Sequence, residues 1–261
     1  MIGGLREQSI FKNNLPNKLL MSIITVVFNG EAFLEKTIKS VLSQTYNNIE
    51  YIIIDGGSTD GTIDIIKKYE DSIDYWISEP DKGIYDAMNK GIAAASEGYL
   101  WFINAGDLIY DNHTINNIFK AGSGDIYYGK TALINDKNKI INTLSVPKSL
   151  SWKDMSRGML VSHQSIIIHK SIADLYNLKY RCISDHDWII NALKKTSRTR
   201  YVDTVFSLYL IEGFSDVNQK KCWAERFQLM KEHYGYIRYI LTYYYFFYSK
   251  LQKVKISLTR K

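Results

Sequence analysis

The chain has 261 residues, of which 46% are hydrophobic and 23% charged, and these proportions exclude a disordered protein. Its formal charge of +6 favours anionic partners, and nucleic acid, phosphorylated ligands and anionic lipid all stay open on this ground. Two cysteines without metal-ligand spacing exclude a disulfide framework and a thiolate zinc site, so a reduced, cytosolic setting fits.

Residues 1–20 form a mixed, polar N-terminal extension in front of the first strong strand pattern, which begins at Met21. The extension lacks the pattern of a secretory signal. Two interpretations stay open: the extension packs on the body of the protein, or Met21 is the natural start, which we slightly favour. No stretch of 18 apolar residues occurs, so we expect no membrane-spanning helix.

Between about residues 22 and 109, strand and helix patterns alternate. Runs of β-branched residues predict buried strands, and apolar residues at helical spacing predict helices between them. We expect Asn29 to cap the first helix and Gly98 to end the third. Such alternation predicts right-handed βαβ units on a parallel sheet, in which ligands bind at the carboxyl ends of the strands. The predicted strands are 22–28, 49–55, 73–78 and 99–104, and the predicted helices are 31–45, 63–69 and 83–98.

The second half of the chain has a less regular pattern, without internal repeats or Pro-rich linkers. It predicts one α/β domain with a C-terminal appendage. The predicted elements are sheet-edge strands at 125–130 and 139–146, a strand with polar ends at 162–169, a helix at 184–195 with acids in its first turn, a longer strand at 200–213, and two helices within 219–250.

Two polar turns follow predicted buried strands. "IIIDGGSTDGT" (52–62) places Asp55 at a strand end, and "NAGD" (104–107) places Asp107 at another. Taken singly, a plain glycine loop and a turn cap are the simpler interpretations. Together with "TVVFNG" (25–30) the two turns favour a ligand site, because a buried carboxylate needs a compensating cation or donor. The dinucleotide-binding and Walker glycine patterns are both missing.

The segments "SIITVVFNGEAFLEKTIKSVLSQTYNNIEYIIIDGGSTDGT" and "SEPDKGIYDAMNKGIAAASEGYLWFINAGD" resemble the family 2 glycosyltransferases. Within that family the chain is similar to bacterial enzymes of exopolysaccharide, capsule and O-antigen assembly, including the colanic acid glycosyltransferases. The resemblance implies a GT-A fold: a single Rossmann-like, mostly parallel central sheet with helices on both faces, plus C-terminal helices. It divides the chain into the N-terminal extension (1–20), a nucleotide-sugar-binding half (21–111), an acceptor-binding half (112–215), and aromatic, basic C-terminal helices (216–261).

The resemblance also implies a donor site, in which Asp55 accepts a hydrogen bond from a uracil-type base and Lys82 balances the diphosphate charge. Asp107 corresponds to the last acid of the family's D-x-D-type motif, which ligates Mg²⁺ or Mn²⁺. Asn104 and Gly106 stand where many relatives carry further acids, so Asp107 is the only certain metal carboxylate. The implied nucleotide-sugar contacts are Thr25, Val26, Phe28, Asn29, Asp55, Gly57, Asp81, Lys82, Asn104 and Ala105.

Inverting transfer to a sugar hydroxyl requires a carboxylate that takes the hydroxyl proton. In "ISDHDWII" (183–190) the family register aligns Asp185 with this base, and Asp187 is the runner-up; helix capping is the alternative role for both. His163 and Gln164 recur in this branch of the family, where they face the acceptor or the metal, and acceptor contact is preferred. Trp188 stacks on a sugar or belongs to the core.

The tail 234–261 is aromatic and basic, and it predicts either a core helix with a solvated end or an interfacial helix. We favour the interfacial helix, with Lys250, Lys253, Lys255, Arg260 and Lys261 toward anionic lipid. No nucleic-acid-binding motif accompanies the charge, so we expect no nucleic-acid partner.

The expected function is that of an inverting, metal-dependent hexosyl- or N-acetylhexosaminyl-transferase. It would use a nucleotide sugar, with a UDP-sugar favoured, and a saccharide acceptor linked to polyprenyl pyrophosphate in bacterial surface polysaccharide synthesis. The enzyme would be cytoplasmic, peripheral on the inner face of the cytoplasmic membrane. A catalytically degenerate nucleotide- or carbohydrate-binding relative is the alternative. A nucleotidyltransferase is disfavoured because "FNGEAF" lacks a Gly-rich, Arg/Lys-bearing signature.

Overall fold

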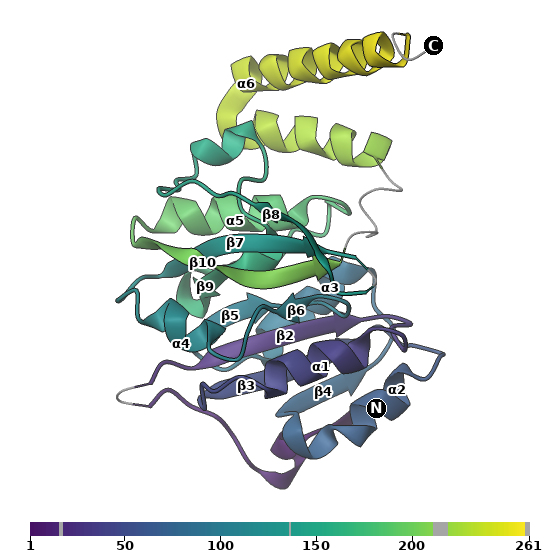
Figure 1. The fold of residues 1–261 in the computed structure, drawn as a ribbon, viewed down its shortest axis with the longest axis vertical. Helices are drawn as coiled ribbons and strands as arrows, with labels where there is room; N and C mark the ends of the chain where they lie inside the picture. The colour runs from purple at the N-terminus through teal and green to yellow at the C-terminus, as the bar shows by residue number, and fades with distance from the viewer. Residues whose placement is uncertain (16–17, 136, 211–218, 259–261) are drawn as a thin grey trace.

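The structure is a computed structural model that describes residues 1–15, 18–135, 137–210 and 219–258. The side chains of 219–221, 242, 243 and 245–258 are outside this description. The described strands form one ten-stranded sheet with the order β1-β4-β3-β2-β5-β9-β7-β10-β6, and β8 pairs with β7 (Figure 1). Their bounds are β1 (Ile2–Gly3), β2 (Met21–Val27), β3 (Ile49–Asp55), β4 (Tyr75–Ser78), β5 (Tyr99–Phe102), β6 (Leu108–Ile109), β7 (Ile126–Ile134), β8 (Ile140–Leu144), β9 (Ile166–His169) and β10 (Thr199–Leu210).

The sheet is mixed, with most strands running in one direction. β4, β3, β2 and β5 pair in parallel, as do β7 and β10. β9 lies antiparallel between β5 and β7, so these two groups of strands point the same way. β1, β6 and β8 are antiparallel to their neighbours. The predicted parallel sheet of βαβ units is therefore confirmed for β2 to β5, and the sheet as a whole is mostly parallel.

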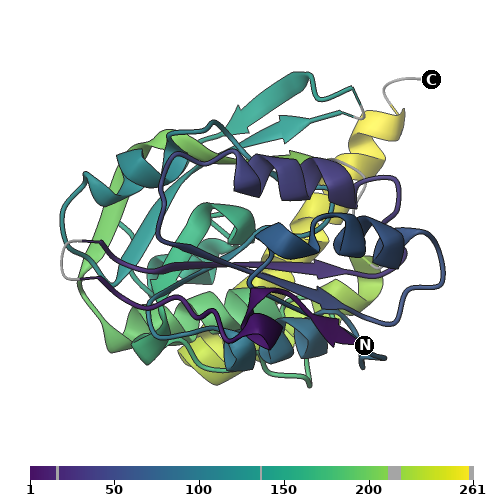
Figure 2. The ribbon, with the colours of Figure 1, turned by 90° about the horizontal axis from the view of Figure 1, so that it is seen from below.

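Helices cover both faces of the sheet (Figure 2). Alternate residues of each central strand enter different cores: Val26 packs with α3 and α5, whereas the adjacent Val27 packs with α1, α2 and α4. This double burial explains the continuous β-branched runs of the sequence. The helices are α1 (Leu34–Leu42), α2 (Thr62–Lys68), α3 (Ile84–Ala94), α4 (Thr114–Phe119), α5 (Ser184–Lys195) and α6 (Gln219–Leu258), with short 3-10 helices η1 (Leu5–Gln8), η2 (Glu70–Ser72), η3 (Asp154–Arg157), η4 (His163–Ser165) and η5 (Lys170–Ile172).

Three local predictions are corrected. Asn29 does not cap α1, because its backbone is left-handed (φ 50°) and its Oδ1 accepts a hydrogen bond from Thr59 N at 2.9 Å. β7 is an interior strand, not an edge strand, since it pairs with β9, β10 and β8. The predicted strand at 162–169 opens with η4, and only Ile166–His169 is extended.

The C-terminal region forms the two predicted helices. Gly235 (φ 80°) interrupts the helical conformation within α6, and Figure 1 shows the two arms of α6 at the end of the molecule that carries α5. In the first arm, before Gly235, Leu229 and Met230 are buried in the same core as α3 and α5; the second arm follows Gly235. The expected boundary at 215/216 falls within residues 211–218, outside the described part. No helix among the described residues is long and apolar enough to cross a bilayer.

The N-terminal extension packs on the body of the protein. β1 pairs with the edge strand β4, and Arg6 Nη2 forms an ion pair with Glu50 at 2.5 Å. The Glu50 side chain is fully buried, and its carboxylate also accepts hydrogen bonds from Ser22 Oγ and from the backbone and hydroxyl of Ser96. Arg6 thus supplies the cation for a carboxylate inside the domain.

Replacing Arg6 by Ala should lower the free energy of unfolding by about 3–5 kcal/mol, because the buried Glu50 carboxylate would lose its cation. The double variant Arg6→Ala/Glu50→Gln should recover most of this loss, since an amide needs no cation. Urea unfolding followed by tryptophan fluorescence measures both effects. Lys68→Ala, which removes an exposed ion pair with Glu35, is the control and should change little. An Arg6→Ala variant as stable as this control would contradict the prediction.

Candidate active site

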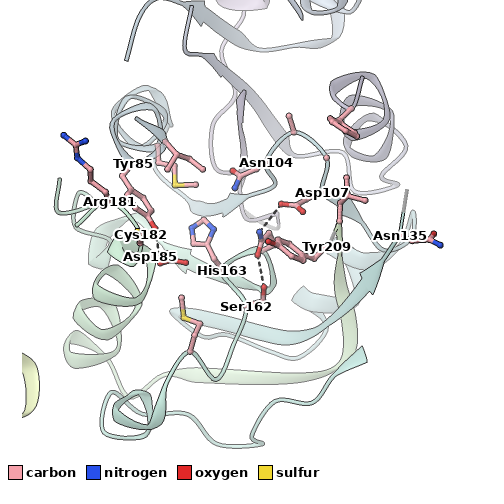
Figure 3. A pocket seen from close by; sticks show the side chains of 18 of the residues that line it. Tyr85, Asn104, Asp107, Asn135, Ser162, His163, Arg181, Cys182, Asp185 and Tyr209 are labelled. Atoms are coloured by element: carbon pink, nitrogen blue, oxygen red, sulfur yellow. Dashed lines mark hydrogen bonds between the residues drawn. The ribbon is translucent and has the colours of Figure 1, made fainter. Parts of the chain in front are cut away.

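A cleft of about 830 Å³ opens at the carboxyl end of β5. It is lined by the turn 104–107, the first turn of α3, η4, the loop before α5, and the end of β10. The turn 104–107 follows β5 at the carboxyl edge of the parallel strands, where ligands bind in such sheets. Figure 3 shows their side chains around the cleft.

The turn that carries Asp107 is held from below by α1. Thr37 Oγ1 donates to the carbonyl oxygen of Asp107 at 2.9 Å and accepts from the backbone N–H of Gly106 at 3.0 Å. Gly106 has a left-handed backbone (φ 102°), which disfavours any acid at this position of the motif. These contacts fix the backbone from which the Asp107 side chain extends.

The Asp107 carboxylate is almost fully buried, with 5% of the residue exposed. Gln164 Nε2, in η4, donates to Asp107 Oδ2 at 3.0 Å, and Gln164 Oε1 accepts from Ser162 Oγ at 2.8 Å. Burial raises the pKa of Asp107 to about 7, and the hydrogen bond from Gln164 offsets only part of this effect. No cationic side chain pairs with it in the described residues, so its charge calls for a cation from outside the chain.

The oxygen donors beside Asp107 fit a hard divalent cation. Asn104 Oδ1, which lines the same cleft, is buried without a hydrogen-bond partner among the described residues. No group of three or more His, Cys, Asp or Glu side chains close enough to hold a metal occurs in that part of the chain. Asp107 alone supplies a carboxylate, so further oxygens would have to come from phosphates and water, an arrangement that Mg²⁺ accepts.

Asp185 lies on the opposite side of the cleft from Asp107, with His163 between them (Figure 3). It stands in the first turn of α5, where Oδ1 accepts from the backbone N–H of His186 at 2.9 Å and from Tyr85 Oη at 3.2 Å. Burial raises the pKa of Asp185 to about 6, while these two hydrogen bonds favour the charged form. Near pH 7 the side chain is a carboxylate with raised basicity.

His163 is buried and neutral. Its Nε2 is 2.5 Å from Tyr176 Oη, and burial lowers its pKa to about 4. Trp188 is corrected to a core residue: its ring stacks on Tyr176, and its Nε1 donates to Asp174 O at 2.7 Å. The indole is 2% exposed and does not line the cleft, so it is not available to a sugar.

Asp187, the second candidate base, does not line the cleft. Its Oδ1 lies 2.6 Å from Nε2 of His233 in α6, and Lys194 Nζ lies 2.7 Å from His233 Nδ1. Because an ammonium group can only donate, Nδ1 is the acceptor and the Nε2 proton points to Asp187. Asp187 therefore joins α5 to α6.

Except for Asn104 and Ala105, which line the cleft, the predicted nucleotide contacts lie at or near the ends of β2, β3 and β4, outside the cleft lining. Asp55 is fully buried and accepts from Ser58 Oγ, Ser78 Oγ and the backbone of Gly57 and Ser58. Gly57 has a left-handed backbone (φ 84°). The carboxylate of Asp81 lies so close to Gly56 that a Cβ there would be 2.3 Å from Asp81 Oδ2, and Phe28 is largely exposed beside the same glycine.

Asn29 and Lys82 are exposed at this edge. Thr25 and Val26 are corrected to core residues, because their side chains are buried and Thr25 Oγ1 donates to Ile103 O at 2.7 Å. Of the predicted residues, the structure brings Asn104, Ala105, Asp107, His163, Gln164 and Asp185 into the cleft.

Several residues of the cleft were not predicted from the sequence. Two of them, Tyr85 and Arg181, lie on the same side of the cleft as Asp185. Tyr85 is the second residue of α3 and follows the predicted Lys82 by three residues. It belongs to a helix that the sequence showed only as an amphipathic pattern, so its hydroxyl gave no separate signal. Arg181 stands four residues before Asp185 in a loop without a motif. The other missed lining residues include Ile84, Met88, Met159, Ser162, Tyr209 and Leu210.

Comparisons with known proteins identify the family of the chain. The sequence profile described as Glycosyl transferase family 2 matches residues 22–191. An uncharacterized glycosyltransferase of Mycobacterium tuberculosis (strain H37Rv) is 34% identical over 183 residues, which cover 66% of this chain and 68% of that protein. A PGL/p-HBAD biosynthesis glycosyltransferase of Mycobacterium bovis (strain BCG) is 27% identical over 201 residues, with coverage of 73% and 76%.

Two solved structures share the fold. S. aureus TarS 1–349 in complex with UDP-GlcNAc superposes with a TM-score of 0.60 at 14% identity, covering 82% of this chain and 71% of that one. The mannosyltransferase PcManGT of Pyrobaculum calidifontis, in complex with GDP-Man and Mn²⁺, gives 0.62 at 12% identity, covering 83% and 64%. The expected fold class is thereby confirmed. With the profile match over most of its length, the chain belongs to glycosyl transferase family 2.

Proposed function

We propose that this chain is an inverting glycosyltransferase that moves a hexosyl or N-acetylhexosaminyl group from a UDP-sugar to a saccharide acceptor. The observation that carries the proposal is the pair of desolvated carboxylates, Asp107 and Asp185, on opposite sides of one cleft. Both have a raised pKa through burial, and each meets a different chemical need of the reaction.

Asp107 and its neighbours would bind the donor diphosphate. Asp107 and the unpartnered Asn104 Oδ1 would hold Mg²⁺ or Mn²⁺. When bound, the ion would stabilise the negative charge of the leaving diphosphate. Lys82 would lie against the same diphosphate, and Phe28 and Asn29 would contact the base and ribose. Asp55 would accept a hydrogen bond from a uracil-type base. The UDP-GlcNAc and GDP-Man in the two solved relatives support a nucleotide sugar as the donor.

Asp185 would take the proton of the acceptor hydroxyl. Its raised pKa makes it a stronger base than an exposed Asp, and Tyr85 and the His186 N–H fix its Oδ1, which leaves Oδ2 for the acceptor. His163 and Gln164 lie on the floor between the two carboxylates, where neutral side chains would contact the sugar without adding charge.

The acceptor would be a saccharide linked to polyprenyl pyrophosphate, and the enzyme would work at the inner face of the cytoplasmic membrane. The second arm of α6 supports this location. Exposed apolar side chains follow one another at helical spacing there, and the sequence beyond them is basic. An anionic bilayer matches both features. The side chains of Lys250, Lys253 and Lys255 and residues 259–261 lie outside the described part. The exposed apolar residues are Tyr236, Ile237, Ile240, Leu241 and Tyr244.

Asp107→Ala should abolish the gain in UDP affinity that Mn²⁺ produces, because this side chain supplies the only carboxylate to the ion. Calorimetric titration of UDP with and without Mn²⁺ measures the gain. Asp71→Ala, which removes an exposed carboxylate of η2 outside the cleft lining, is the control and should keep the gain. If Mn²⁺ still strengthens UDP binding in Asp107→Ala, the metal assignment is wrong.

Asp185→Asn should reduce transfer by at least about 10²-fold with near-normal UDP-sugar affinity, because the amide cannot accept the hydroxyl proton. A hydrolysis screen of UDP-, GDP- and TDP-sugars first selects the donor, and transfer is then followed into lipid-linked saccharides. Asp187→Asn is the matched control: it weakens the contact with His233 and should lose stability more than activity. An inactive Asp187→Asn beside an active Asp185→Asn would move the base to Asp187.

The pH dependence should follow Asp185. Its carboxylate must be charged to act, and its pKa is about 6, so kcat/KM should fall as the pH drops through about 6 and level off above it. Rates are measured at saturating Mn²⁺, since a bound cation lowers the pKa of Asp107 and removes it from this range. A profile flat down to pH 4.5 would contradict the assignment.

Ile237→Ser/Ile240→Ser should weaken binding to phosphatidylglycerol vesicles by at least about tenfold, because burying each of these side chains contributes to membrane affinity. Vesicle sedimentation measures the change, and UDP affinity should stay constant. Leu175→Ser/Leu178→Ser removes two other exposed apolar side chains, outside α6, and is the control. Equal losses in both variants, or a wild type that does not sediment with vesicles, would refute the interfacial role of α6.

A further inference from the structure

Arg181 is the one Lys or Arg side chain among the described residues that line the cleft. The residue is exposed, and its guanidinium has no hydrogen bond or ion pair with any described residue. The cleft otherwise carries the two carboxylates Asp107 and Asp185. A single cation in an acidic cleft marks the place where an anionic part of a ligand is tolerated.

The backbone at Arg181 is fixed from outside its own loop. Glu225 of α6 accepts the Arg181 N–H at 2.9 Å (Oε1) and 3.0 Å (Oε2), and the Cys182 N–H at 2.8 Å (Oε2). One carboxylate thus anchors two successive peptide groups of a loop without regular structure. This anchor holds the base of the Arg181 side chain at the mouth of the cleft.

Lys179, two residues earlier, shows the contrast within the same loop. Its ammonium group is paired with Glu232 of α6, which also accepts a hydrogen bond from Tyr180 Oη. Helix α6 therefore neutralises the ammonium group of Lys179, but it binds only the backbone of Arg181. The guanidinium of Arg181 remains available to a ligand.

The position of Arg181 indicates which substrate it meets. It precedes Asp185 by four residues, and Figure 3 shows it on the side of the cleft that carries Tyr85 and Asp185, opposite Asp107. The donor diphosphate belongs with Asp107 and Lys82. An anion at Arg181 would therefore be part of the molecule whose hydroxyl lies at Asp185.

We propose that Arg181 is an anion-binding subsite for the acceptor and takes a phosphate or carboxylate group attached to the accepting saccharide. This inference rests on the proposed function and narrows its acceptor class. The planar guanidinium binds two oxygens of either group at once, and it offsets the repulsion that the two cleft carboxylates exert on an anionic acceptor.

Three octyl amphiphiles that differ only in their head group test the subsite: octyl phosphate, octyl β-glucuronide and octyl β-glucoside. Each is titrated, below its micelle concentration, into protein saturated with UDP and Mn²⁺, so that the diphosphate site is filled. The wild type should bind at least one anionic amphiphile about tenfold or more tightly than the neutral glucoside. The anion with the larger preference identifies phosphate or carboxylate as the group recognised.

In Arg181→Ala the anionic and neutral amphiphiles should bind equally, and Arg181→Lys should keep part of the preference. Lys179→Ala removes a cation of the same loop and should keep all of it. The proposal would be overturned if the wild type did not prefer an anionic amphiphile, or if Arg181→Ala kept this preference. Loss of the preference to the same extent in Lys179→Ala would also overturn it. The series is repeated without UDP: failure of UDP to bind would refute the proposed donor site, whereas the amphiphile preference still tests Arg181 alone.

Discussion

The desolvated carboxylate of Asp107 is the constraint on which the rest of the site depends. A carboxylate at the end of a buried strand is held there only if the surrounding backbone is rigid and some partner compensates its charge. Thr37 and the left-handed Gly106 supply the rigid turn, and Gln164 supplies one neutral donor. This partial compensation leaves Asp107 with a raised pKa and a demand for a cation, which a metal–diphosphate pair would meet.

The two carboxylates of the cleft are separated by neutral groups. His163 is kept uncharged by burial, and Gln164 carries no charge at any pH. A charged histidine at this place would pair with one carboxylate and lower its pKa. Because His163 and Gln164 are neutral, the raised pKa of Asp185 is kept and Asp107 stays free to bind a cation. The proposed transfer needs the first property at the acceptor and the second at the donor.

Helix α6 supports the side of the cleft that carries Asp185. Leu229 and Met230 complete the core under α5, His233 bonds to Asp187, and Glu225 anchors the loop before Asp185. The same helix continues, past Gly235, into the exposed apolar arm that we assign to the bilayer. The proposed membrane attachment and the geometry around the proposed base thus depend on the same helix.

The sequence by itself determined the parallel half of the sheet and the family, because buried β-branched strands, amphipathic helices and the glycine turns at their ends are local patterns. The family resemblance also pointed to Asp107 and Asp185, and the structure brings both side chains to one cleft. Tertiary structure alone decided that Arg6 fills a charge requirement at Glu50, that β7 lies inside the sheet, and that Trp188 and Thr25 are core. It alone placed Tyr85 and Arg181 on the side of the cleft that carries Asp185, and it joined the predicted Gln164 to Asp107 by a hydrogen bond. Burial and charge compensation depend on residues that are far apart in the chain. Local sequence patterns therefore cannot predict which residues become partners.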